Sequence, residues 1–288
     1  MTRVSPSCAA REAGIDFLDD ARYDDETGTA PIRTGWSEVV FGELFRASGW
    51  RREDVTIANK LWWEHWPDED ATKELDGSLG RLGFDHVDLI YAIAPPTTLP
   101  VATVVEQVAG LIASGRARAW ATGMWSGPAL TECLDVCDAT GAPRPVGAQM
   151  SCSLAEHGQA SDPTIRAALD RGPIGLVAAH VLAGGTLSGK YVDDPSRPGR
   201  AGQDENPVAR RGKQIAASLV ELGNAWGVEA AHLAIAYALG HPNLASVLFG
   251  ATSPEQVYAN VGAIDTFSKL DADQRAAIDA LADLAPEQ

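Results

Sequence analysis

The sequence predicts an α/β fold of the (β/α)8 barrel class, also called the TIM barrel, in one domain that spans residues 1–288. Short, nearly continuous apolar runs are bounded by turn residues, as expected for parallel strands buried on both faces. Amphipathic stretches separate these runs, and a repeated strand-then-helix order implies a parallel sheet with right-handed crossovers. An open doubly wound sheet is the alternative. It is weakened because no Gly-x-Gly-x-x-Gly turn follows the first predicted strand.

Seven strands are predicted, one fewer than a closed barrel of this class needs. They cover residues 15–19, 55–59, 87–93, 118–122, 146–150, 175–180 and 246–250. Because so little sequence precedes residue 15, we expect the first barrel strand to be short, irregular or missing. An unpaired strand edge is costly to bury. A second copy of the chain, forming a homo-oligomer, is one way to cover it.

The helices predicted between the strands follow from spacing and from caps. Leu75, Leu79 and Leu82 recur at helical spacing. Pro128 lies where the first turn of another helix is expected. The predicted helices cover residues 37–47, 70–82, 101–113, 128–139, 208–226 and 230–239.

Composition narrows the class of partner. A net charge of −16 argues against a nucleic acid, since that binding needs clustered Lys and Arg. No apolar run reaches the roughly 18–20 residues of a membrane helix, and the first residues have no apolar leader segment, so a cytoplasmic protein is expected. The cysteines and histidines show no ligand spacing, and we therefore expect no metal.

An acid, a tyrosine and a lysine follow the first two predicted strands. Asp19 ends the first strand, Tyr23 comes shortly after it, and Lys60 follows the second strand. A phenol with a pKa of about 10 is a poor acid near neutral pH unless a nearby cation favours the phenolate. Lys60 could supply that cation, and Asp19 could hold Lys60 charged and oriented. A plain buried ion pair with a rim tyrosine is the structural alternative.

Tryptophans and two glycine-containing segments extend this candidate site. Trp62 and Trp63 follow Lys60 directly, and Trp125 follows the strand 118–122. They predict a wall for a bulky or aromatic small-molecule substrate, with packed loop anchors as the alternative. The glycine-rich loop 184–189 would let backbone N–H groups approach a pyrophosphate. Ser253 precedes a proline at a predicted helix start, which favours anion binding.

These segments, in this order, resemble the aldo-keto reductase family from about Gly14 almost to the end of the chain. The resemblance implies NADPH-dependent reduction of an aldehyde or ketone. Tyr23 would donate the proton, Lys60 would lower its pKa and Asp19 would orient Lys60. The residues implied to bind NADP(H) are Gln149, Leu182, Gly184, Leu187, Gly189, Lys190, Gly250, Ser253, Gln256 and Asn260.

The departures from the family pattern cluster on the chemistry. Ile93 stands where the family has a histidine, and Tyr23 follows Asp19 by four positions instead of five. Gly123-Met124 replaces a Ser-Asn pair, and Ala179 replaces a stacking tyrosine. His180, next to Ala179, is a candidate substitute for the lost histidine or a structural residue. Two alternative functions follow: non-redox acid–base chemistry such as dehydration, isomerisation or cyclisation, and a redox-inactive barrel with a binding role.

Overall fold

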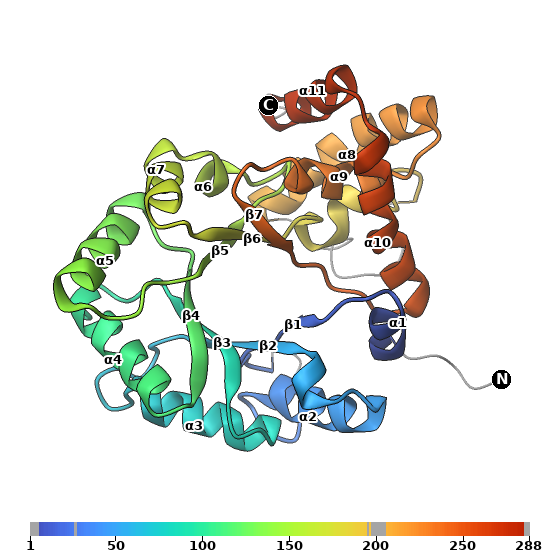
Figure 1. The fold of residues 1–288 in the computed structure, drawn as a ribbon. Coiled ribbons are helices and arrows are strands. Elements are labelled where there is room, and N and C mark those ends of the chain that lie inside the picture. Colours follow the sequence, from blue (N-terminus) through green and yellow to red (C-terminus); the bar gives the residue numbers. More distant parts are fainter. Residues whose placement is uncertain (1–5, 26–27, 195, 197–205, 285–288) are drawn as a thin grey trace. The chain divides into compact units, whose positions relative to one another are not determined.

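The computed structural model describes residues 6–25, 28–194, 196 and 206–284 (Figure 1). By their contacts these residues form two compact units, which we describe separately. The first unit takes Met1–Gln149 and Pro163–Ile174, and the second takes Met150–Asp162 and Gly175–Gln288.

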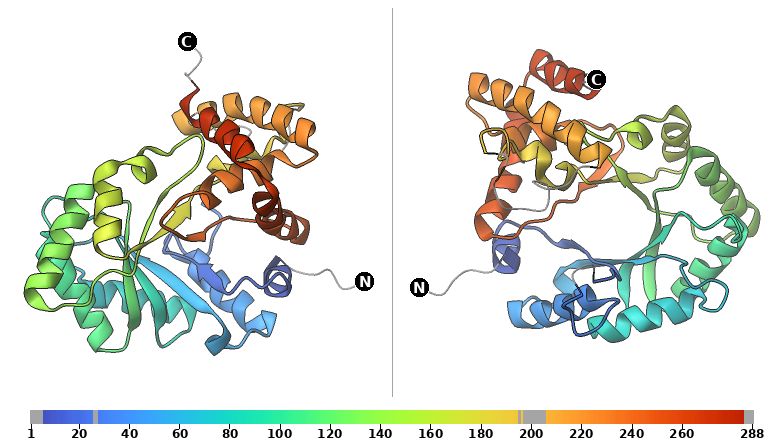
Figure 2. Two further views of the ribbon diagram at one scale, coloured as in Figure 1. Left: turned by 45° about the horizontal axis from the view of Figure 1, so that its top comes forward. Right: turned by 180° about the vertical axis from the view of Figure 1, so that it is seen from behind.

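The first unit is built on parallel strands with helices between them. Each strand pairs with the next one along the chain. Helices α2 to α5 cover the same face of strands β2, β3 and β4 (Figures 1 and 2). The strands are β1 (Phe17–Asp19), β2 (Thr56–Leu61), β3 (Val87–Ile93), β4 (Ala117–Gly123) and β5 (Gly147–Ser151), whose last two residues belong to the second unit. The helices are α1 (Pro6–Glu12), α2 (Trp36–Ser48), η1 (Arg52–Asp54), α3 (Ala71–Leu82), α4 (Val101–Ala113), α5 (Gly127–Thr140) and α7 (Pro163–Arg171).

The second unit holds two parallel strands and a helical core. Strand β6 (Gly175–Ala179) pairs with β7 (Leu244–Val247), with an irregularity at Leu176/Val177. The N–H of Cys152, just after β5, donates to the carbonyl of Ala179 at 3.1 Å. The helices are α6 (Gly158–Ser161), η2 (Ala183–Ser188), α8 (Pro207–Trp226), α9 (Ala230–Leu239), α10 (Pro254–Lys269), α11 (Ala272–Ala280) and η4 (Leu281–Asp283).

Local sequence explains where several helices begin. The side chain of Asp70 accepts the N–H of Lys73 at the start of α3, and Ser126 accepts that of Ala129 at the start of α5. Asp271 opens α11 with a capping box. Such caps satisfy N–H groups that have no partner within the helix.

The fold class predicted from the sequence is confirmed. All seven predicted strands occur within the described residues, helices alternate with them, and neighbouring strands are consecutive in the chain. This order is that of the (β/α)8 class, because a doubly wound sheet reverses its order at a switch point. Strand β1 has three residues, Phe17–Asp19, where the sequence predicted five. Helices α6, α7 and α11 were not predicted from the sequence.

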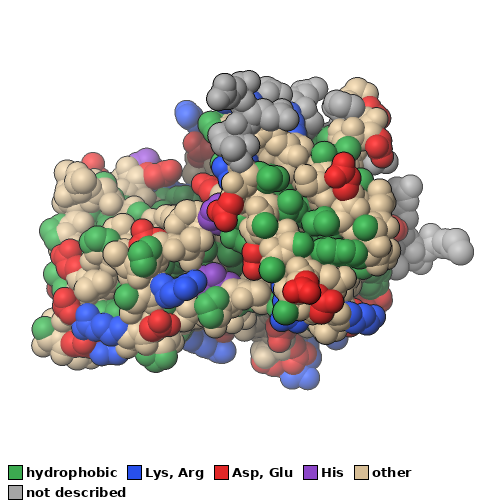
Figure 3. All heavy atoms as spheres, turned by 90° about the horizontal axis from the view of Figure 1, so that it is seen from above, with side chains coloured by type: hydrophobic (Ala, Val, Ile, Leu, Met, Phe, Trp, Pro, Cys, Tyr) green, Lys and Arg blue, Asp and Glu red, His purple; other side chains and the backbone are tan. Residues whose placement is uncertain are grey.

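The surface and the cysteines add little to the site. Figure 3 shows one face of the molecule, on which acidic side chains lie in small groups between hydrophobic and neutral ones. All four cysteines are free thiols. Among the described residues, no cluster of His, Cys, Asp and Glu is arranged to hold a metal ion. None of the described helices has both the length and the apolar character needed to cross a membrane.

Candidate functional site

A buried ion pair forms the centre of the site in the first unit. Asp19 is the last residue of β1, and Lys60 lies near the carboxyl end of β2. The Lys60 Nζ atom lies 2.7 Å from Asp19 Oδ1, and the two side chains are only 5% and 13% exposed. Gln149 on β5 donates from Nε2 to the other oxygen, Asp19 Oδ2, at 3.0 Å. Both oxygens of Asp19 are thus engaged, and the ammonium of Lys60 is held in one place.

Tyr91 lies against this ion pair and was not recognised in the sequence. It is the register partner of Lys60 on β3 and is fully buried. The Lys60 Nζ atom lies 5.6 Å from the centroid of its ring. Burial raises the pKa of the Tyr91 phenol far above its ordinary value, and the negative charge of Asp19 acts in the same direction. Tyr91 therefore stays neutral and is a poor proton donor.

Within the described part of the chain, the Tyr91 hydroxyl has no partner in hydrogen-bonding geometry. A buried hydroxyl without a partner destabilises the folded state. Tyr91→Phe keeps the ring over Lys60 and removes only this oxygen. We expect it to raise the free energy of unfolding by about 1 kcal/mol, measured by urea denaturation. A loss of about 1 kcal/mol instead would show that a water molecule or Gln149 satisfies the hydroxyl.

Tyr23 lies at the rim of the first unit. Its side chain is half exposed, and its carbonyl accepts the N–H of Gly35 at 2.8 Å. Its ring meets that of Trp62 edge to face, with centroids 5.9 Å apart. Among the described residues, no hydrogen bond joins the Tyr23 hydroxyl to Lys60. The structure thus brings Asp19, Lys60 and Gln149 together and leaves Tyr23 beside Trp62.

Of the three tryptophans predicted to line a substrate site, two instead hold strand β3 in place. Trp63 and Trp125 are almost fully buried. Their indole N–H groups donate to the carbonyls of Ile93 at 3.0 Å and of Ala92 at 2.8 Å. These bonds hold the carboxyl end of β3. Trp62 is the more exposed of the three, and it alone contacts Tyr23.

Ile93 and Gly123 are two positions at which this chain departs from the family pattern, and they face each other. They are register partners on β3 and β4. A Cβ atom added at Gly123 would collide with Cδ1 of Ile93. The glycine therefore makes room for the isoleucine that stands in place of the family's histidine. The two departures are one packing solution, and neither residue offers a side-chain hydrogen bond.

Asp20 is a second acidic group at this strand end that sequence reasoning missed. Burial raises the pKa of its carboxyl to about 7; the backbone N–H of Ala21 opposes the shift, and the negative charge of Glu38 adds to it. Glu38 is fully buried on α2 and accepts from Asn59 at 2.9 Å and from Arg81 at 2.5 Å. The pair Asp19-Asp20 at a strand terminus is the only sequence signal that pointed to Asp20.

His180 belongs to the second unit. It follows β6, is exposed, and has a left-handed backbone conformation with φ 56°. Its Nδ1 atom lies 3.0 Å from the hydroxyl of Ser151. A residue other than glycine in this conformation is uncommon and is found more often at functional sites and turns. His180 therefore has a defined orientation set by Ser151.

The predicted pyrophosphate loop is a turn that needs its glycines. Gly184, Gly185 and Gly189 all have positive φ, of 69°, 100° and 79°. A Cβ at Gly184 would meet nothing within 4 Å, so the backbone there borders open space. Lys190 Nζ lies 3.7 Å from the position of a Cβ at Gly185. An open glycine backbone beside an ammonium group fits a phosphate group.

The remaining nucleotide segment begins α10. Ser253 is the N-cap and accepts the N–H of Gln256 at 3.4 Å, while Gln256 Oε1 accepts the N–H of Thr252 at 2.8 Å. Gly250 borders open space, and Asn260 is a buried residue of α10. A helix N-terminus favours an anion. No Lys or Arg occurs in residues 249–260, so a phosphate there would depend on N–H and hydroxyl groups.

The two remaining predicted cofactor residues occupy different surroundings. Leu187 is fully buried in the core of the second unit, and Leu182 is partly buried and packs against that core. Leu182 also accepts the N–H groups of Gly185 and Leu187 at 2.8 and 3.3 Å through its carbonyl. The structure therefore gives both residues a part in shaping the glycine loop.

Comparison with known proteins agrees with this arrangement. A family model described as "Aldo/keto reductase family" matches residues 8–283. A protein of Oryza sativa subsp. japonica named "Probable voltage-gated potassium channel subunit beta" is 30% identical over 281 residues, covering 91% of this chain and 81% of the relative. A protein of Arabidopsis thaliana with the same name is 28% identical over 274 residues, covering 90% and 81%. The chain therefore belongs to the aldo/keto reductase family.

Proposed function

We propose that the protein is an NADPH-dependent reductase of a bulky or aromatic aldehyde or ketone. Family membership suggests NAD(P)-dependent oxidoreduction. The observation that carries the proposal is the buried Lys60–Asp19 pair, fixed from the other side by Gln149. Such a preorganised cation next to a strand end is suited to stabilise negative charge that develops on a carbonyl oxygen.

The chain's residues take distinct roles in this proposal. Bound NADPH would supply the hydride. Lys60 holds positive charge near the reacting oxygen, and its ion pair with Asp19 orients it. Tyr23 donates the proton, because its exposed hydroxyl can approach a substrate, whereas burial raises the pKa of Tyr91 too far for that task. His180 would orient a substrate in place of the lost histidine.

We propose cofactor-binding roles for residues of each unit separately. In the first unit, Gln149 would contact the nicotinamide end. In the second, the open backbone at Gly184 and the ammonium of Lys190 would hold the pyrophosphate. Ser253 and Gln256 at the start of α10, with Asn260, would hold the adenosine end. A cytoplasmic location and a homo-oligomer stay predictions.

Tyr23→Phe tests the proton donor. We expect kcat/KM for benzaldehyde to fall by about 10²–10⁴, the usual contribution of a general acid, with NADPH affinity unchanged. Turnover is followed by NADPH oxidation and affinity by calorimetry. Tyr237→Phe, on α9 in the second unit, is the matched control and should keep wild-type kinetics. Wild-type turnover by the Tyr23→Phe protein would remove Tyr23 from the mechanism.

A binding role is the second candidate. It is favoured by the names of the two relatives and by Ile93 in place of the family's histidine. Tight NADPH binding without oxidation across a panel of aldehydes and ketones would support this candidate over a reductase. Non-redox acid–base chemistry is separated from both by calorimetry, because it predicts no NADPH binding.

A further inference from the structure

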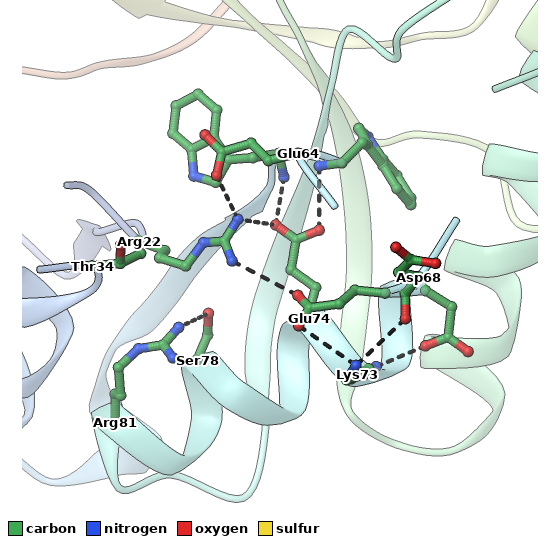
Figure 4. A network of polar contacts seen from close by, with 12 residues as sticks. Arg22, Thr34, Glu64, Asp68, Lys73, Glu74, Ser78 and Arg81 are labelled. Atoms are coloured by element: carbon green, nitrogen blue, oxygen red, sulfur yellow. Dashed lines mark hydrogen bonds and ion pairs between the residues drawn. The ribbon is translucent and has the colours of Figure 1, made fainter. Parts of the chain in front are cut away.

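Figure 4 shows a network of ion pairs in which Arg22 faces Glu64 and Glu74. Its centre is Arg22, whose side chain is only 8% exposed. The Arg22 guanidinium lies 2.8 Å from Glu64, 3.4 Å from Glu74 and 3.9 Å from Glu69. A single buried cation therefore faces three carboxylates that come from the segment after β2 and the start of α3.

Glu74 joins this network to the backbone after β2. Its side chain is 4% exposed. One oxygen accepts the N–H of Trp62 at 2.8 Å, and the other accepts the N–H of Trp63 at 3.2 Å. Burial raises the pKa of Glu74, while the Trp62 N–H and the charge of Arg22 act against that rise. The charge of Arg22 thus favours the ionised form of Glu74, and an ionised carboxylate accepts both backbone bonds more strongly.

Arg22 also directly precedes Tyr23 in the sequence. The loop that Tyr23 opens is closed by Gly35 at its far end and by a bridge between Asp24 and Thr34. Arg22 therefore links two separate segments, one carrying Tyr23 and one carrying Trp62. The edge-to-face contact of these two rings depends on both segments keeping their places.

We propose that Arg22 is a positioning residue that fixes Tyr23 and Trp62 as one aromatic face, which selects flat aromatic carbonyl compounds over aliphatic ones of similar size. This inference rests on the proposed function for its substrate class. Arginine suits the task because its planar fork can serve several carboxylates at once, whereas a lysine ammonium acts as a point charge. Aromatic rings held edge to face present area with little loss of entropy when a flat ligand stacks on them.

The test uses the full chain as Arg22→Met, Arg22→Lys and Glu74→Gln variants. The control is Arg116→Met, which removes a partly exposed arginine bound to Asp76 outside this network. The first readout is hydrogen exchange at the amides of Trp62 and Trp63. We expect exchange to become at least about tenfold faster in Arg22→Met, intermediate in Arg22→Lys, and unchanged in the control.

The second readout is affinity for naphthaldehyde and for octanal, measured by tryptophan fluorescence without cofactor. We expect Arg22→Met to weaken naphthaldehyde binding about tenfold and to leave octanal binding unchanged. Because neither readout requires turnover, a wild-type protein that reduces nothing would sink the proposed function and leave this inference standing. Unchanged exchange and unchanged selectivity in Arg22→Met would overturn the inference even in an active reductase. A wild-type protein with no preference for naphthaldehyde would overturn it as well.

Discussion

Lys60→Met is expected to lower the free energy of unfolding by about 3 kcal/mol, because it leaves the carboxylate of Asp19 buried without its cation. Lys60 and Asp19 are both almost fully removed from solvent. Gln149 still donates to Asp19, but a neutral amide cannot replace the charge. Stability is measured by urea denaturation. Carbonyl reduction should fall by at least about 10², since the same cation stabilises the developing charge.

A double-mutant cycle separates the pair from the general loss of a side chain. Asp19→Asn alone should also destabilise, and the double variant Asp19→Asn/Lys60→Met should lose less than the sum of the single changes. Arg116→Met at the exposed pair with Asp76 is the control and should cost at most about 1 kcal/mol. Additive effects at Asp19 and Lys60 would show that the two charges are not coupled.

Asp20→Asn is expected to stabilise the protein at alkaline pH and to flatten its dependence on pH. The pKa of Asp20 is raised by burial from 3.8 to about 7. Between those values the folded state binds a proton that the unfolded state does not, so stability falls as pH rises through this window. Above it, the folded state carries the full cost of a buried charge, up to about 4 kcal/mol for such a shift. Asparagine does not titrate and avoids that cost.

The measurement is urea denaturation of both proteins at about pH 5 and about pH 8. The gain from Asp20→Asn should be small at the lower pH and large at the higher one. Asp76→Asn is the control. It should lower the free energy of unfolding, because the hydrogen bond from Arg116 lowers the pKa of Asp76. Equal effects of Asp20→Asn at both pH values would show that this carboxyl does not titrate in the window.

Much of the fold follows from local pattern. Buried parallel strands are nearly continuous apolar runs, and this is why all seven strands were predicted close to their observed bounds. Helices α6 and α7 were missed because they are short, with 4 and 9 residues, and offer too few turns for a periodic pattern. Helix α10 was predicted only at its start, where Ser253 and Pro254 give a cap signal, while its apolar residues are not arranged in a clear stripe.

Part of the candidate site could likewise be predicted from the sequence, and part of it could not. Asp19 and Lys60 could be predicted as neighbours, because the carboxyl ends of parallel strands meet at one edge of the sheet. Tyr91 could have been found from the alternation of β3, since it lies on the same face as Ile93, two residues later. The roles of Trp63 and Trp125 could not be predicted from the sequence. A tryptophan after a strand packs as an anchor or faces a ligand according to which carbonyl its N–H can reach.

The sequence by itself determined the barrel class, the family and the pairing of Asp19 with Lys60, since these depend on periodicity and on the order of segments along the chain. The tertiary structure decided the surroundings of that pair: Tyr91 against Lys60, Asp20 beside Glu38, and Arg22 among three glutamates. These contacts join residues far apart in sequence, and their energies come from burial and from charges that only the folded chain brings together.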